Sequence, residues 1–150
     1  MADTREAILS RLVTLLGGLA GVDEVLRNQV VVDDEEGRTR RIVVLEGEEI
    51  PADDEPPKRR PAAAPRTIHM QPQILLSNFA GAADVGPGLS AIRAAVIKAI
   101  AFDSALIALT YDGSGGHYLG MQSDLAFAQA MAGEAALKFR FTYVLRPDQL

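Results

Sequence analysis

The chain has 150 residues and a mass of 16.0 kDa, and its 20 acidic and 15 basic side chains give a net charge of −5. This length predicts one domain that buries a core of its own. The absence of cysteine excludes disulfides, zinc–cysteine sites and thiol catalysis, and the acidic balance disfavours a general nucleic-acid binder. No apolar run approaches the roughly 20 residues of a membrane span, and the N-terminal residues lack an export signal, so we expect cytoplasmic synthesis and folding.

An amphipathic helix is predicted from Asp3 onward. Asp3 and Glu6 have the spacing of a capping box, although the usual cap is Ser or Thr. Glycines at 17, 18 and 21 end the pattern. Apolar residues recur on one side at helical spacing, namely Ile8, Leu9, Leu12, Val13, Leu15, Leu16 and Leu19.

The next segments predict a β-hairpin followed by a long loop. Residues 22–32 and 42–45 have strand character, and a charged turn lies between them. Residues 46–66 hold five of the eight prolines together with acidic and basic clusters, so no packed element is expected there. We interpret about residues 50–66 as a long, mobile, proline-rich loop and as the first candidate for contact with a partner.

The rest of the chain alternates between strand and helix patterns. Residues 68–79 predict a strand in which Pro72 indicates an edge position or a bulge. After a turn over 81–88, a second amphipathic helix is predicted over 89–100, with a short helical turn over 103–109 behind it. Residues 117–120 predict a short strand. Residues 123–133 predict a helix, although Leu125, Phe127 and Met131 would also fit a strand.

The last element is the clearest strand, because residues 137–145 have a period-two pattern in which Leu137, Phe139, Phe141, Tyr143 and Leu145 alternate with Lys138, Arg140, Thr142 and Val144. Helices and strands do not follow the regular alternation of a parallel doubly wound sheet. The sequence therefore predicts an α+β fold. We expect a largely antiparallel sheet with two main amphipathic helices packed on one face, and long charged loops.

Two glycine-rich segments and two histidines are the candidates for chemistry. The amides near Gly86 and Gly88 precede a helix and offer an anion site, but the Rossmann and P-loop spacings are both missing. A carboxylate, a hydroxyl and an imidazole, the groups that hydrolases use for nucleophilic catalysis, occur at Asp112, Ser114 and His117. The sequence around them has no nucleophile elbow. His69 and His117 alone are weak evidence for a metal. We therefore predict no catalytic, metal or cofactor site, and a small anion-binding module stays open as an alternative.

Five segments carry a resemblance to a known family: 5–12 with Gly21-Val22 and Arg27-Asn28, then 41–49, 89–100 with Asp103 and Leu106, Tyr118–Gly120, and 137–143. In pattern and order they resemble the tail terminator proteins, also called tail-completion or minor tail protein U-like proteins, of long-tailed bacteriophages. The resemblance covers nearly the whole chain. Arg41 stands where the family often has a proline, and residues 46–66 are unusually proline-rich and charged.

The resemblance implies a mechanical role in the virion. Subunits would form a hexameric ring on the last ring of the tail tube, stop its polymerisation and present the surface that the DNA-filled head joins. The implied partners are further copies of this chain, the tail tube protein and head–tail connector proteins, with passing contact to genomic DNA in the lumen. No reaction, cofactor or membrane is implied. Another neck protein, such as a head–tail adaptor, is the nearest alternative.

A closed ring needs two different contact patches on each subunit. The charged loops are too polar to pack inside the domain, and the last strand leaves one face free. We expect the cations of that face to pair with the acidic turn 33–36. The expected interface residues are Asp33, Asp34, Glu35, Glu36, Arg38, Arg40, Asp53, Asp54, Glu55, Lys58, Arg59, Arg60, Lys138 and Arg140.

Overall fold

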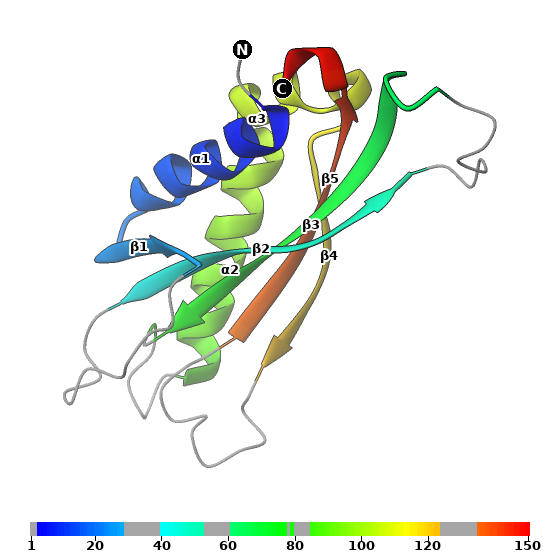
Figure 1. The fold of residues 1–150 in the computed structure, drawn as a ribbon. Helices are drawn as coiled ribbons and strands as arrows, with labels where there is room; N and C mark the ends of the chain where they lie inside the picture. The colour runs from blue at the N-terminus through cyan, green and yellow to red at the C-terminus, as the bar shows by residue number, and fades with distance from the viewer. Residues whose placement is uncertain (1–2, 29–39, 53–60, 78, 80–84, 124–134) are drawn as a thin grey trace.

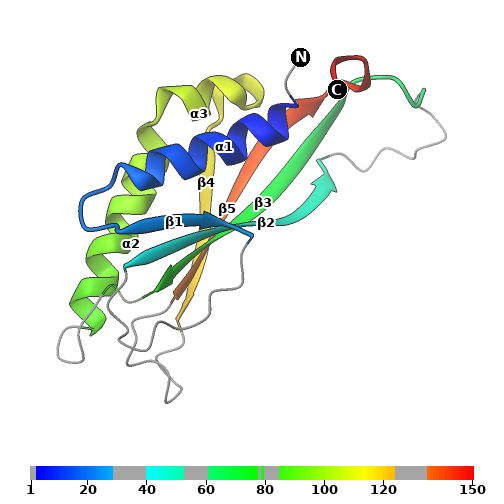
Figure 2. The same ribbon diagram turned by 60° about the vertical axis from the view of Figure 1, so that its left-hand side comes forward.

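A five-stranded sheet carries all the described helices on one of its faces (Figures 1 and 2). The computed structural model describes residues 3–28, 40–52, 61–77, 79, 85–123 and 135–150. The strand order is β1-β2-β3-β5-β4. The elements are α1 (Thr4–Gly17), β1 (Glu24–Arg27), β2 (Arg41–Pro51), β3 (Arg66–Ser77), α2 (Val85–Phe102), α3 (Ser104–Leu109), η2 (Tyr111–Gly113), β4 (Gly116–Ser123), β5 (Ala135–Leu145) and η4 (Pro147–Gln149).

The predicted fold class is confirmed. Strands β2, β3, β5 and β4 pair antiparallel, and only β1 and β2 are parallel. Both ends of the chain lie at the same end of the molecule as α3 (Figure 1). Within the described part of the chain, no helix combines the length and the apolar character that a membrane crossing requires.

Helix α1 begins where the sequence predicts. The Asp3 carboxylate caps it by accepting a hydrogen bond from the Arg5 amide at 3.0 Å. The reciprocal bond of a capping box does not form, because the Glu6 carboxylate binds Arg27 and Ser10 instead. Ile8, Leu9, Leu12 and Leu16 are fully buried on the predicted side.

The predicted hairpin over residues 22–45 is wrong. Strand β1 spans only four residues and runs parallel to β2, with Glu24 opposite Arg41 and Arg27 opposite Val44. A tight turn cannot join parallel strands, because the chain must first return to the end where β1 began. The pattern of apolar and charged residues was compatible with either direction. The acidic turn itself, at 33–36, lies outside the described residues.

Strand β2 continues to Pro51, through the first part of the segment expected to hold no packed element. Its pairing with β3 reaches Pro51 opposite Ile68, and the Ala52 amide donates to the Thr67 carbonyl at 2.9 Å. A neighbouring strand satisfies the backbone of these polar residues, which local propensity could not show. The charged middle of the predicted loop, at 53–60, lies outside the described residues.

Pro72 lies in a bulge, as one of the two predicted alternatives required. The edge position is excluded, because β3 lies between β2 and β5. Leu45 is opposite Gln73 and Glu48 is opposite Gln71, so two residues of β2 face Pro72 alone. One of them is Gly47, with φ of +67°, and a Cβ there would lie 2.9 Å from the Gln71 carbonyl carbon and still nearer its oxygen. Only glycine fits this position.

The core fills the space between the sheet and the helices. Alternate residues of β5 face it, as predicted, alternate residues of β3 do so too, and α2 adds Ile92, Val96 and Ile100. Helix α2 starts at Val85 rather than Leu89, so the predicted turn over 81–88 is partly helical. Proline is tolerated there because the amides of the first turn have no partner within the helix. The predicted helix over 123–133 falls almost wholly outside the described residues.

An ion pair between Arg11 of α1 and Asp103, at the start of α3, holds these two helices together. The Arg11 guanidinium holds the Asp103 carboxylate through two bonds, Nη2 to Oδ1 at 2.6 Å and Nε to Oδ2 at 2.9 Å. Asp103 also caps α3 by accepting from the Leu106 amide at 3.0 Å, as predicted for the short helical turn. Hydrogen bonds from Arg11 lower the pKa of Asp103, so the pair stays ionised in ordinary buffers.

Candidate functional site

The face of the sheet opposite the helices is the candidate site, and we call it the open face. The alternation of β3 and β5 directs their polar side chains to it. Gln73 lies opposite Lys138, and His69 lies opposite Thr142. Lys138 is exposed and Arg140 is half-buried on this face, as the alternation of the last strand predicts.

The three described cations of the open face, Arg41, Lys138 and Arg140, differ in what holds them, and Arg41 Nε donates to Glu24 Oε2 at 3.1 Å. The Gln71 amide oxygen, turned toward Arg140, accepts from Nη2 at 2.9 Å and from Nε at 3.3 Å. His69 Nδ1 lies 2.7 Å from the Thr142 hydroxyl, and burial, helped by the charge of Arg140, lowers the pKa of His69. Lys138 forms no ion pair with any described residue. Lys138 is therefore the cation of this face that is available to a partner.

The sheet also has two unlike edges. Strand β4, at one edge, contains no charged residue, and its Leu119 and Met121 side chains are 45% and 39% exposed. Leu119 is an extra residue between the pairs Tyr118–Phe139 and Gly120–Lys138, so this edge is bulged. Strand β1, at the other edge, is short and starts at the acidic Glu24, directly after Asp23.

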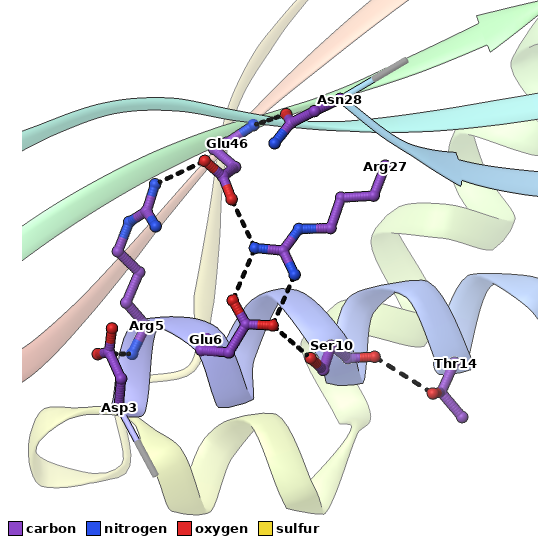
Figure 3. Close-up of polar contacts among 8 residues, drawn as sticks. All are labelled: Asp3, Arg5, Glu6, Ser10, Thr14, Arg27, Asn28 and Glu46. Carbon is purple, nitrogen blue, oxygen red and sulfur yellow. Dashed lines mark hydrogen bonds and ion pairs between the residues drawn. The ribbon is translucent and has the colours of Figure 1, made fainter. Parts of the chain in front are cut away.

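A network of ion pairs fixes β1 against α1 and β2 (Figure 3). Arg27 on β1 donates to both oxygens of Glu6 at 2.6 and 2.8 Å and to Glu46 at 2.5 Å, and Arg5 donates to Glu46 at 3.1 Å. The hydrogen bonds from Arg27, then Ser10, lower the pKa of Glu6 to about 2, and those from Arg27 and Arg5 lower that of Glu46. The strand at this edge is therefore held rigidly.

Acid is expected to weaken this network. A carboxylate whose folded pKa lies below its unfolded value stabilises the protein fully above the unfolded value, and this stabilisation is lost as the pH falls through the folded pKa. For Glu6 the window runs from 4.5 down to about 2. The urea concentration at the midpoint of unfolding should therefore fall as the pH is lowered from 4.5 to about 2, and it should fall less steeply in Arg27→Gln. The exposed Lys98→Gln is the matched control, and equal slopes in all three proteins would contradict the assignment.

Most of the expected interface residues in the two loops lie outside the described residues. These are Asp33, Asp34, Glu35, Glu36, Arg38, Asp53, Asp54, Glu55, Lys58, Arg59 and Arg60. Arg40 is described and exposed, but it lies just before β2, across the sheet from Lys138 and Arg140. Of the three described members of the predicted set, the structure brings together Lys138 and Arg140.

Arg40 instead borders a cavity of about 230 Å³ next to the first turn of α2. The cavity is otherwise apolar apart from backbone. Its lining residues are Ala20, Gly21, Arg40, Phe79, Gly88, Ala91, Ile92 and Ala95. One of the two glycines proposed for an anion site is thus near a cation that the sequence did not associate with it.

The hydrolase groups are not assembled in the described structure. Asp112 and Ser114 are exposed in the turn around η2, whereas His117 lies on β4 opposite Arg140. Among the described residues, no hydrogen bond joins any two of the three. The same part of the chain contains no group of three or more potential metal ligands.

Sequence reasoning missed Gln71 and the edge of β4, which pairs with no described residue on its outer side. The alternation of residues 68–79 places Gln71 on the same face as His69, but only the register of β3 against β5 brings it beside Arg140. Neither protein-family models nor curated proteins match this sequence. The function is therefore inferred from the open face, the two edges and the segments that resemble tail terminators.

Proposed function

We propose that the protein is a structural virion protein that forms a closed ring at the head-proximal end of a bacteriophage tail tube. The observation that carries this proposal is the sheet, which has one face packed by helices, an open face and two unlike edges. A subunit of this kind offers two different surfaces, which ring closure requires. The order of α1, the first strands, α2 and the closing strand also agrees with the segments that resemble tail terminators.

The ring would act by covering a surface rather than by catalysing a reaction. A ring of subunits, hexameric by the resemblance, binds the last ring of tube protein and occupies the surface where the next would dock. Tube growth stops, and the opposite side of the ring receives the head–tail connector. No bond is made or broken and no cofactor is needed. The charged segments at 33–36 and 53–60 are candidates for contacts that form on assembly.

The first experiment is the absolute mass of the purified protein by multi-angle light scattering over a concentration series, with and without isolated tail tubes. Closed rings, seen by negative-stain microscopy alone or on tube ends, are the expected result. A monomer or simple dimer at every concentration, inert toward tubes, would contradict the proposal. Rings that bind isolated connectors and ignore tubes would instead identify a head–tail adaptor.

Lys138 and Arg140, the two cations that β5 places on the open face, are expected to contribute to ring formation. Reversing both, in Lys138→Glu/Arg140→Glu, places like charges near the acidic segments of a neighbour and should raise the concentration at which rings form by about tenfold or more at low salt. Lys98→Glu, an exposed position on α2, is the control for a charge change alone. Unchanged ring formation by the double variant would remove these residues from the interface.

A small anion-binding module is the second candidate, favoured by the cavity that Arg40 and Gly88 line together. It predicts saturable thermal stabilisation by inorganic phosphate that Arg40→Gln abolishes. A ring protein instead gains stability with its own concentration, because assembly favours the folded state by mass action. A thermal shift series in phosphate and in protein concentration distinguishes the two.

A further inference from the structure

We infer that subunits join by adding β1 of one copy to the free edge of β4 of the next, so that the sheet continues from subunit to subunit. This inference rests on the proposed ring and specifies which surfaces form it. The occupant of each edge is a second copy of this chain.

Strand β4 has the properties of an edge that accepts another strand. Natural edge strands usually avoid pairing by carrying charges, proline or bulges. Strand β4 carries neither a Lys, Arg, Asp or Glu nor a proline over its eight residues, and its bulge is confined to Leu119, so that Gly120–Ser123 form a regular edge beyond it. Exposed Leu119 and Met121 provide apolar surface on it. An added strand gains backbone hydrogen bonds along the edge and packs against such side chains.

Strand β1 has an ordered backbone edge that no described residue pairs with. The Glu24 amide donates to the carbonyl of Arg40, just before β2, at 3.3 Å, and the Asn28 amide donates to that of Val44 in β2 at 3.0 Å, so the amides of Val25 and Arg27, which alternate with them, point away from β2. The Arg27 side chain is held by Glu6 and Glu46 (Figure 3). A strand fixed in advance loses little conformational freedom on pairing.

Charge favours joining these two edges rather than two copies of β4. On the open face, Lys138 is opposite Gly120 of β4, where an added Cβ would meet no atom within 4 Å. The lysine can therefore extend over Gly120 toward a strand added beyond β4. Two strand spacings are about 10 Å, which Lys138 and an acidic side chain reaching toward it can close. Asp23 just before β1 and Glu24 at its start supply the acid: Glu24 lies on the open face, where it also accepts from Arg41 Nε at 3.1 Å, and Asp23 accepts from the Arg40 amide, so each has a further oxygen for a lysine of the next copy.

Pairing of two different edges also gives the head-to-tail symmetry that a closed ring requires. Pairing β4 with β4 would use the same patch twice and make a two-fold dimer, whereas β4 with β1 is head-to-tail. Head-to-tail contacts can close into a ring of several subunits. The expected product is therefore a cyclic assembly and not a dimer.

Cross-linking tests the pairing directly, because the natural chain has no cysteine. Gln122 is exposed on β4 and Leu26 is half-buried on β1, and both lie on the open face by register. In rings of Leu26→Cys/Gln122→Cys, a short bis-maleimide should give a ladder of covalent multimers on a denaturing gel. Leu26→Cys/Lys98→Cys is the matched control and should give none. Circular dichroism checks that both variants fold.

The other possible results separate a failure of this strand pairing from a failure of the proposed ring. Covalent dimers from Gln122→Cys alone would show two-fold pairing of β4 and overturn the inference. Folded rings without a ladder would overturn it and leave the proposed function standing, whereas a wild-type chain that never forms rings would overturn both. Lys138→Gln should weaken the ladder at low salt and Lys98→Gln should not, and equal ladders would overturn the role of Lys138.

Discussion

Replacing Gly47 with alanine is expected to lower the free energy of unfolding by at least about 3 kcal/mol. The residue has φ of +67°, and its Cβ would press into the Gln71 carbonyl across the bulge. That carbonyl belongs to a central strand paired on both sides, so it cannot move without disturbing β2 or β5. Urea unfolding followed by circular dichroism measures the loss.

Gly17→Ala is the matched control for the loss of a glycine. A Cβ at Gly17 would lie 3.8 Å from Val25 Cγ2, an ordinary contact, and the residue is in the last turn of α1. Alanine there should change the free energy of unfolding by no more than about 1 kcal/mol, in the stabilising direction. Equal losses in the two variants would show that the bulge does not require glycine.

Phe141→Ala is expected to destabilise the protein by about 3–5 kcal/mol. Phe141 is fully buried in the middle of β5, beside Ile100 of α2 and the close-packed Gly116 of β4. Removal of the ring leaves a cavity where sheet and helix meet, and strands paired on both sides cannot close it. The loss of stability is measured as the shift in the urea concentration at the midpoint of unfolding, with the dependence of the free energy on urea unchanged.

Phe102→Ala removes the same ring from the surface. Its side chain is 78% exposed at the end of α2, so its truncation should change stability by no more than about 0.5 kcal/mol. A loss of several kcal/mol in Phe102→Ala would show that this end of the protein is covered in solution. A small effect of Phe141→Ala would contradict the position of β5 in the core.

Local patterns in the sequence predicted the helices and strands that have one apolar, buried face. The helical spacing from Ile8 to Leu16 and the alternation from Leu137 to Tyr143 each identified an element and its buried side. Asp3 and Asp103 identified two helix starts, because a carboxylate can satisfy free amides from a neighbouring position in the chain. These signals involve residues close in sequence.

The direction of β1, the length of β2 and the partner of Arg140 were decided only by tertiary structure. Parallel and antiparallel strands need the same local pattern, and Glu48 and Glu49 became part of a strand because β3 pairs with them. Gln71 meets Arg140 through the register of two strands far apart in the chain. The sequence by itself determined which side of each element is apolar, because the spacing of apolar residues along the chain indicates which side chains face the core. Tertiary structure decided which strands are neighbours and which edges stay free, because strand pairing is made by backbone groups that every residue shares.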